Sequence, residues 1–251
     1  MPSSASGRPP GLEPPRTNQF LAALRPLDYS LLAPHLRVVE LERGAVLHDA
    51  DQPIEHVYFL HSGMVSIVTI MLNGAAVETA TVGRMGAIGS NAGFGSHRAI
   101  GRAIVQLPAT ASRLPSSRFH AIARESDAIH ELAVRYNDVL IAQIQQSVAC
   151  QALHTLEARL CRWLLRSLDC VDSNTIPLTQ EFLAQMLGVR RTSVTLAART
   201  LQSAGLIHYR RGHIQVIDRA GLERATCECY AAVRERIDEI FPTIDDASPT
   251  P

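Results

Sequence analysis

The sequence has no lysine: all 24 of its basic residues are arginine, and 24 acidic residues balance them. It also lacks any apolar run approaching the roughly 18 residues that a membrane-spanning helix needs, so we expect no membrane segment. The first residues contain no apolar stretch of the kind found in a secretion signal. An apolar share of 46% can nevertheless fill a globular core, which excludes fibrous and wholly disordered proteins. We expect a cytoplasmic protein of one large or two modest domains.

Cysteines are few, and none precedes Cys150. The total of five is odd, and nothing in the sequence suggests an oxidising compartment, so we expect reduced thiols. We place Cys227 and Cys229 on one C-terminal helix, where side chains two residues apart point in different directions and chelate one metal poorly. We therefore predict no metal site; the cofactor is unknown, and a redox-sensing role for these cysteines stays open. Four histidines also lack the spacing of metal ligands: His48, His56, His61 and His97.

Charge is unevenly distributed toward the C-terminus. Residues 178–217 contain five arginines against one glutamate, whereas residues 218–251 contain four arginines against eight acidic residues. A compact basic segment in an otherwise neutral protein favours binding to a polyanion, although an ordinary solvated face could have the same composition.

The N-terminal half is predicted to consist of a disordered arm and a β domain. Residues 1–18 contain five prolines, which is typical of a disordered arm. Residues 19–126 then show short apolar runs separated by turns, and Asn73-Gly74 between two such runs is a strong hairpin signal. The pattern indicates an antiparallel roll or sandwich followed by a short helix near 116–124. The expected strands are 36–41, 57–60, 64–72, 75–82, 103–107 and 110–114.

One long helix is predicted over 127–153, because this segment contains neither proline nor glycine. Its apolar residues occupy more than one face, so it must be covered on more than one side. A second copy of the same helix is the economical partner, which assigns 127–155 to dimerisation. The alternative, a central helix in a monomeric bundle, would need several partner helices. The expected dimer contacts are Leu132, Tyr136, Leu140 and Ile144.

Residues 156–241 are predicted to form a second domain, followed by a flexible tail over 242–251. Within it, Thr179 can cap a helix that Gly188 ends, and a second helix then turns Val194, Ala197 and Leu201 inward. This spacing is typical of a helix-turn-helix, whose second helix enters the major groove of DNA. Beyond it, two short extended runs flank the basic sequence Arg210-Arg211-Gly212-His213, which is typical of a wing that contacts the phosphate backbone.

Roll, long helix and winged helix-turn-helix, in this order, resemble the Crp/Fnr superfamily of bacterial regulators. The resemblance covers residues 20–220 and is strongest at 178–217. It implies an α+β fold with an N-terminal antiparallel β-roll like that of cyclic-nucleotide-binding domains, a long dimerisation helix and a C-terminal winged helix-turn-helix. It further implies a homodimer that binds palindromic double-stranded DNA and contacts RNA polymerase.

The resemblance also implies functional residues. Arg191 matches the first arginine of the family's Arg-Glu-x-x-x-Arg reading pattern, but Thr192 replaces the glutamate and Leu196 the second arginine. We therefore expect a half-site that differs from the family's common one. The expected base contacts are Arg190, Arg191, Thr192 and Thr195. The expected phosphate contacts are Thr179, Gln180, Ser193, Arg199, Arg210, Arg211 and His213.

The sensor resembles the family's nucleotide pocket less closely. Gly89-Ser90-Asn91 lacks the carboxylate that would bind the ribose, and Arg102-Ala103 keeps the phosphate-binding arginine without its neighbouring hydroxyl. We therefore expect an unidentified small-molecule effector other than cyclic AMP, in a pocket near Gly89, Ser90, Arg102 and Ala103. A purely structural role for Arg102 stays open.

Two other functional classes remain as alternatives. An enzyme would need a nucleophile with its base or a pair of acidic groups, and no such motif is apparent, so we expect no catalysis. A small-molecule-binding module with a vestigial DNA domain is the second alternative, and the intact pair Arg190 and Arg191 argues against it.

Overall fold

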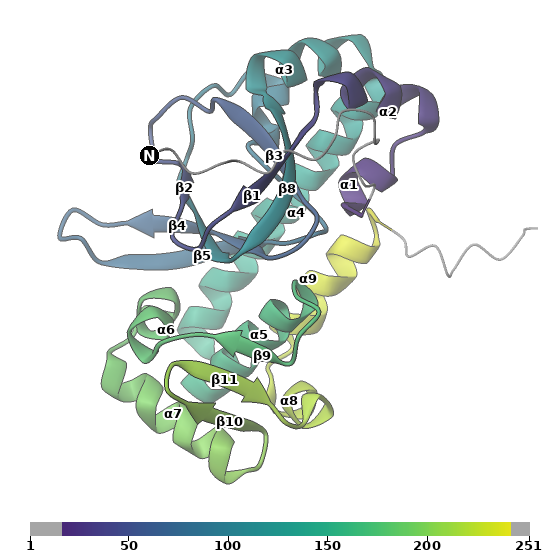
Figure 1. Ribbon diagram of the computed structural model, residues 1–251. Coiled ribbons are helices and arrows are strands. Elements are labelled where there is room, and N and C mark those ends of the chain that lie inside the picture. Colours follow the sequence, from purple (N-terminus) through teal and green to yellow (C-terminus); the bar gives the residue numbers. More distant parts are fainter. Residues whose placement is uncertain (1–16, 242–251) are drawn as a thin grey trace, which may run out of the picture.

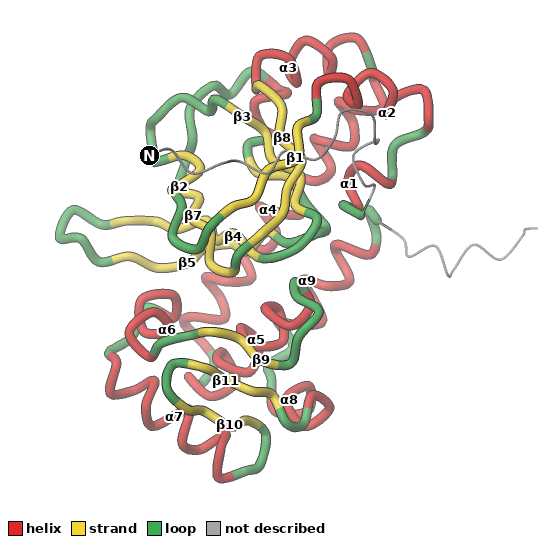
Figure 2. The backbone as a smooth tube through the Cα atoms, in the orientation of Figure 1, coloured by secondary structure: helices red, strands yellow, loops and turns green. Residues whose placement is uncertain are grey.

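The structure is a computed structural model that describes residues 17–241 (Figure 1). A β-roll and one long helix, α4, precede a C-terminal domain of helices and three short strands. Figure 2 shows the strands of the roll above the three strands of the C-terminal domain. Most of the predicted arm and the whole predicted tail, 242–251, lie outside the described residues. No helix within 17–241 is both long and apolar enough to span a membrane.

The chain enters the roll through a buried asparagine. Asn18 is fully buried; its side-chain amide donates to the carbonyl oxygens of Leu60 and Gly86, each at 2.8 Å, and its side-chain oxygen caps the next helix. The predicted disordered arm, 1–18, is therefore wrong at its C-terminal end, because these long-range bonds fix Asn18 in place. Three short helices follow: α1 (Gln19–Ala22), α2 (Pro26–Leu32) and η1 (Ala33–His35).

The roll consists of two four-stranded antiparallel sheets, with strand orders β1-β8-β3-β6 and β2-β7-β4-β5. The hairpin predicted at Asn73-Gly74 joins β4 to β5, and Gly74 has the positive φ of 82° that favours glycine there. A short helix, η2 (Ser90–Phe94), lies between β6 and β7. The strands are β1 (Arg37–Leu41), β2 (Val46–His48), β3 (His56–Leu60), β4 (Met64–Ile70), β5 (Ala76–Val82), β6 (Ala87–Ile88), β7 (Arg102–Leu107) and β8 (Ala109–Pro115).

Helices α3 (Ser116–Glu125) and α4 (Asp127–Leu153) follow the roll. Ser126 caps α4 by accepting a hydrogen bond of 3.3 Å from the amide of Ile129. One face of α4 packs into the protomer's own core, and this face includes Leu132 and Tyr136, which are only 8% and 4% exposed. This corrects the expectation that Leu132 and Tyr136 contact a second subunit.

A different face of α4 is left uncovered. Val134, Ile141 and Val148 are 38%, 46% and 65% exposed and lie seven residues apart. Leu140 and Ile144, also predicted as dimer contacts, are half-buried beside this stripe. Sequence alone does not show which face of the helix the roll covers, so Val134 and Ile141 were not among the expected dimer contacts.

The C-terminal domain begins with α5 (Leu156–Asp169), which Thr155 caps. Its elements are then β9 (Thr175–Pro177), α6 (Gln180–Leu187), α7 (Arg191–Ser203), β10 (Ile207–Arg210), β11 (His213–Val216), α8 (Arg219–Ala225) and α9 (Cys229–Asp238). The single C-terminal helix that we expected is therefore two helices separated by residues 226–228. Cys227 lies in this turn and not on a helix, which corrects the placement of both cysteines on one helix.

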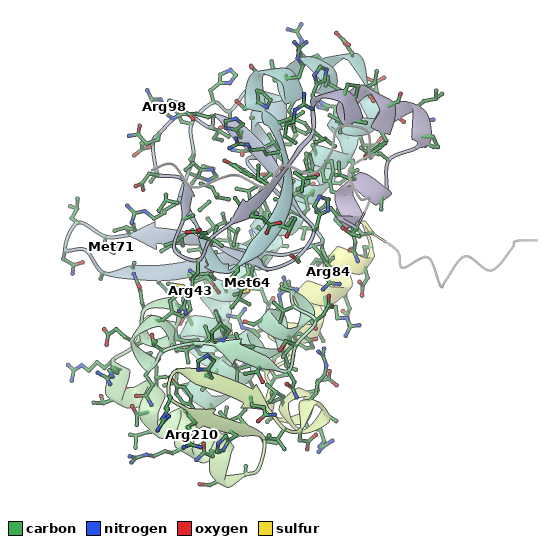
Figure 3. All side chains as sticks on the ribbon, viewed as in Figure 1. Arg43, Met64, Met71, Arg84, Arg98 and Arg210 are labelled. Atoms are coloured by element: carbon green, nitrogen blue, oxygen red, sulfur yellow. The ribbon has the colours of Figure 1, made fainter. Side chains whose placement is uncertain are left out.

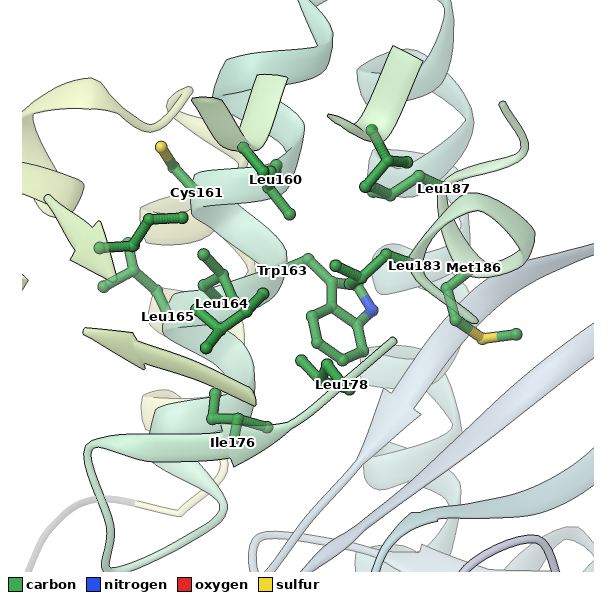
Figure 4. Close-up of a cluster of buried hydrophobic side chains, with 14 of the residues drawn as sticks. Leu160, Cys161, Trp163, Leu164, Leu165, Ile176, Leu178, Leu183, Met186 and Leu187 are labelled. Atoms are coloured by element: carbon green, nitrogen blue, oxygen red, sulfur yellow. The ribbon is translucent and has the colours of Figure 1, made fainter. Parts of the chain in front are cut away.

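The roll and the C-terminal domain share one hydrophobic core, part of which is drawn in Figure 4. Trp163, on α5, lies between Leu164, Leu178 and Leu183 in this cluster. Met64, Val68 and Leu107 come from the roll and belong to the same cluster. The labels in Figure 3 place Met64 and Arg43 on the side of the roll that faces the C-terminal domain. The C-terminal domain is therefore packed against the roll as well as joined to it by the chain.

Candidate nucleic-acid interface and sensor cavity

The first helix of the predicted helix-turn-helix begins and ends as its sequence indicates. The hydroxyl of Thr179 accepts a hydrogen bond of 3.2 Å from the amide of Phe182, which caps α6. Gly188 ends the helix in the left-handed conformation, with a φ of 64°. The amide of Val189 then donates to the carbonyl of Ala184 at 2.9 Å, so the chain reverses at once and starts the second helix.

The second helix, α7, presents a polar outer face. Val194, Ala197 and Leu201 are buried as predicted. On the opposite side, the expected DNA contacts Arg191, Thr192 and Arg199 are exposed, Arg190 is exposed at the N-cap position, and Ser193 is half-buried. Leu196 is 63% exposed on the same helix, where sequence reasoning placed it in the position of a family arginine.

The predicted wing is an antiparallel hairpin of β10 and β11 in which Arg210 is paired with His213. The two residues at its tip, Arg211 and Gly212, have positive φ angles of 49° and 77°. Positive φ at both central residues is typical of the two-residue turn that matches the twist of a hairpin. Arg210, Arg211 and His213 are exposed, and Figure 3 labels Arg210 at the edge of the domain.

Helix α6, helix α7 and the wing together line a cleft of about 310 Å³. Thr179 and Gln180 come from the start of α6, Arg191 from the start of α7, and Arg211 and Gly212 from the wing. The amides at the start of α6 add a partial positive charge, so the cleft suits an anion such as a phosphate group. A second cleft of about 190 Å³ joins Gln180 to Thr195 and Arg199.

Tyr209 is a site residue that sequence reasoning missed. It lines both clefts, its hydroxyl donates to the carbonyl of Leu178 at 3.0 Å, and its amide donates to the side chain of Gln202 at 2.8 Å. Burial raises the pKa of its phenol, which keeps the group protonated. Tyr209 therefore fastens the wing to the start of α6. The position of Tyr209 directly before Arg210 and Arg211 was the signal in the sequence that could have identified it as a site residue.

Two of the expected DNA contacts are bonded to each other. The hydroxyl of Thr195 lies 2.8 Å from the side-chain oxygen of Gln180 and donates to it, which links α7 to α6. Gln180 also lines both clefts, so this bond lies at the point where they meet.

The roll contains a cavity of about 300 Å³ between its sheet and α4. Gly89 and Ser90 line it, as expected, whereas Arg102 and Ala103 are not among its lining residues. Arg102 instead forms two hydrogen bonds to the carboxylate of Asp49, with Nε–Oδ1 and Nη2–Oδ2 distances of 3.0 and 2.6 Å. These bonds hold the pKa of Asp49 below its usual value. Arg102, expected from the resemblance to bind phosphate, is therefore engaged by a carboxylate outside the cavity.

Polar groups in the cavity are neutral. His48 lines the cavity, its Nδ1 atom is buried with no hydrogen-bond partner among residues 17–241, and burial lowers the pKa of the imidazole. Asn137, from α4, lies on the same wall as Leu140, Ile141 and Ile144. Within the described part of the chain, neither arginine nor a carboxylate lines the cavity. Sequence reasoning missed His48 and Asn137 because neither belongs to a motif.

Two domain families match the chain. Residues 38–126 match the cyclic nucleotide-binding domain, and residues 158–225 match the Crp-like helix-turn-helix domain. These matches fall on the roll and on the C-terminal domain, and together they cover more than half of the chain. No curated protein matches the sequence.

Solved structures with the same fold are distant in sequence. A transcriptional regulator of the crp/fnr family from Eubacterium rectale is 17% identical, with a TM-score of 0.65, over 81% of this chain and 95% of that chain. FixK2 from Bradyrhizobium japonicum is 14% identical, with a TM-score of 0.65, over 76% and 98%. The c-di-GMP responsive regulator CLP from Xanthomonas campestris is 14% identical, with a TM-score of 0.62, over 77% and 100%. The two domain matches and this common fold lead to one assignment: the chain belongs to the Crp/Fnr family of DNA-binding transcription regulators.

Proposed function

We propose that the protein acts as a homodimer that reads a palindromic DNA site and responds to a small uncharged ligand in the roll. The observation that carries the DNA part is the convergence of Arg191, Arg211 and the start of α6 on one cleft. Helix α7, the wing and the N-terminus of α6 all face one space of the size of an anion. Such an arrangement can contact the phosphates on both sides of a DNA groove.

The uncovered stripe of α4 supports the homodimer. Val134, Ile141 and Val148 repeat every seven residues, which is the spacing that brings two parallel helices together along a seam. A second copy of α4 buries this stripe and places the two α7 helices on the same side of the dimer.

The exposed residues of α7 divide into two proposed roles. Arg191 stands at the first helical position and can pair with the O6 and N7 atoms of guanine. Thr192 offers a hydroxyl where the family pattern has a carboxylate, and Leu196 offers an apolar surface suited to the methyl group of thymine. Ser193 and Arg199, together with the wing residues Arg210, Arg211 and His213, contact phosphates and position the helix.

The proposed ligand is small, uncharged and mostly apolar. Its polar group meets the unpartnered Nδ1 of His48, and its apolar part packs against Leu140 and Ile144. An anionic cyclic phosphate would enter a cavity that no arginine of residues 17–241 lines, and Arg102 is bonded to Asp49. The related regulator CLP is described as responsive to c-di-GMP, so ligands other than cyclic AMP occur with this fold.

As the resemblance implies, RNA polymerase is the further partner that we propose.

A ligand-binding module with a vestigial DNA domain is disfavoured, because Arg190, Arg191 and Arg211 are exposed and α6 and α7 are fully formed.

A randomised-site selection with the full-length protein tests this function. We expect a palindromic consensus whose half-sites lie about one helical turn apart, which is about 10–10.5 base pairs from centre to centre. We expect calorimetry to show no low-micromolar binding of cyclic AMP, because the missing acceptor at Ser90 removes about 1.5–3 kcal/mol. A selection that enriches no site would contradict sequence-specific DNA binding. Tight binding of cyclic AMP that strengthens DNA binding would contradict the proposed ligand.

A further inference from the structure

Four possible metal ligands meet where α4, the start of α5 and the turn before α9 converge. They are Cys150, His154, Cys227 and Cys229, and their donor atoms all lie within 4.8 Å of one another. The expectation of no metal site depended on placing Cys227 and Cys229 on one helix. In the structure Cys227 precedes α9, which begins at Cys229, so the divergent directions of helical side chains do not apply to this pair.

Two separations within this group match those between ligands of one tetrahedral ion. Sγ of Cys150 lies 3.5 Å from Sγ of Cys227, and Sγ of Cys229 lies 3.4 Å from Nδ1 of His154. Zinc bonds of about 2.3 Å to sulfur and about 2.0–2.1 Å to nitrogen, arranged as a tetrahedron, place ligand atoms about 3.5–3.8 Å apart. A four-iron cluster binds one thiolate at each iron and spreads its ligands wider than this. Three cysteines and one histidine are also a common ligand set of structural zinc.

The groups around the four ligands are those that support a bound metal. Nε2 of His154 lies 3.2 Å from the carboxylate of Glu228, which leaves Nδ1 free to face the thiols. Such a carboxylate behind a histidine is typical of metal ligands, because it fixes the ring and its tautomer. The side-chain amide of Gln146 donates to Sγ of Cys229 at 3.0 Å, a bond that stabilises a thiolate.

Burial and charge point the same way. Cys150, Cys227 and Cys229 are 0%, 7% and 0% exposed and form a small cluster against which Ala158 packs. Arg159 is buried beside them, its Nε has no hydrogen-bond partner among residues 17–241, and it interacts electrostatically with Cys150. A zinc ion with three thiolates and one neutral imidazole carries one net negative charge, which a buried guanidinium would balance.

We propose that Cys150, His154, Cys227 and Cys229 bind one zinc ion. On binding, the three thiols release their protons to solvent, and the zinc forms three bonds to sulfur and one to Nδ1 of His154. His154 is also the C-cap residue of α4. Helix α9 runs back along α4 toward the roll (Figure 1). The ion would therefore join the end of α4 to the start of α9 and fix the link between α4 and the C-terminal domain.

The first test measures metal in untagged, full-length protein purified without chelators. Elemental analysis should give one zinc per protomer, and the C227S variant should contain almost none. The matched control is C161S, because Cys161 is also buried but lies in the main hydrophobic core and not in this cluster. Loss of zinc in C161S as large as in C227S would overturn the proposal.

A second measurement keeps the test valid if C227S does not fold. Zinc is removed from the wild type with a chelator, and the apoprotein is titrated with Zn²⁺ or Co²⁺. We expect the thermal midpoint to fall on removal and to return with one equivalent of zinc, and Co²⁺ to give the ligand-field bands of a tetrahedral thiolate site. Wild type that contains no zinc and binds none at micromolar concentration would refute the site, as would a Cys150–Cys227 disulfide in anaerobically purified protein.

Discussion

The indole Nε1 of Trp163 donates a hydrogen bond of 3.0 Å to Oε1 of Glu78 and thereby joins α5 of the DNA-binding domain to β5 of the roll. The hydroxyl of Ser66, on β4, donates to the other carboxylate oxygen. Desolvation of this carboxyl group raises its pKa to about 7, although the two hydrogen bonds and the nearby Arg162 and Arg166 oppose the shift. The contact between the roll and the C-terminal domain therefore contains a carboxyl group whose pKa lies near neutral pH.

Glu78 should make the protein less stable as pH rises. Its pKa of about 7 lies above the ordinary value of 4.5, so the folded state retains a proton that the unfolded state has released between these values. The free energy of unfolding should fall through this window by at most about 1.4 kcal/mol per pH unit and then level off. Denaturant titrations between about pH 5 and about pH 8 should show this fall in the wild type and a smaller one in E78Q. In the control E40Q, an exposed glutamate is replaced, and the fall should persist; equal slopes in E78Q and wild type would contradict the assignment.

The I141E substitution should dissociate the dimer. Ile141 lies in the middle of the uncovered stripe, so a glutamate there would be buried without a partner at the seam, at a cost on the order of several kcal/mol. Sedimentation at micromolar concentration should show a dimer for the wild type and a monomer for I141E. The control L27E places the same charge at a leucine that is 83% exposed on α2 and should remain dimeric. A monomeric wild type would refute the homodimer.

Arg191 and Arg211 should differ in what they contribute to DNA binding. R191A should cost about 1–3 kcal/mol per half-site and relax the preference at one base position. R211A should weaken binding to all sequences alike and lower the salt slope by about one unit for each phosphate that the variant no longer neutralises. The control R118A, on the surface of α3, should change neither. Site selections at two salt concentrations provide the measurement; an altered consensus in R211A with an unchanged one in R191A would reverse the two roles.

Asn18 should be essential to the stability of the roll. N18A would leave the buried carbonyls of Leu60 and Gly86 without their donor, at about 1–3 kcal/mol for each unsatisfied group. The matched control is N73A, because Asn73 is exposed at the β4–β5 turn and accepts one local bond from Ala75. We expect a clearly lower thermal midpoint for N18A and a small change for N73A. Equal thermal midpoints for N18A and wild type would show that the hydrogen bonds of Asn18 contribute little to stability.

Sequence predicted the elements that local signals define. Helix α4 has the predicted bounds, because Ser126 can cap it and no proline or glycine interrupts the segment up to Leu153. The helix-turn-helix was equally readable, since Thr179 and Gly188 are specific start and stop residues. Strands β2 and β6 have three and two residues and carry too little pattern to be found.

What sequence did not predict depends on residues far apart in the chain. Arg102 is bonded to Asp49, 53 positions away, so its pairing could not be separated from a role in the pocket. Leu132 and Val134 look alike in the sequence, and only the packed roll shows which of them is covered. The break between α8 and α9 has no proline or glycine to signal it, so the neighbours of Cys227 were misplaced.

Ile141 belongs both to the cavity of the roll and to the stripe of α4 that we propose as the dimer seam. It lines the cavity of the roll and is also 46% exposed on the seam of α4. A ligand that shifts this side chain therefore alters the surface on which the partner's helix rests, and through it the wall of the second cavity. By linkage, the first ligand changes the affinity for the second. Binding curves should thus show cooperativity, with a Hill coefficient different from one.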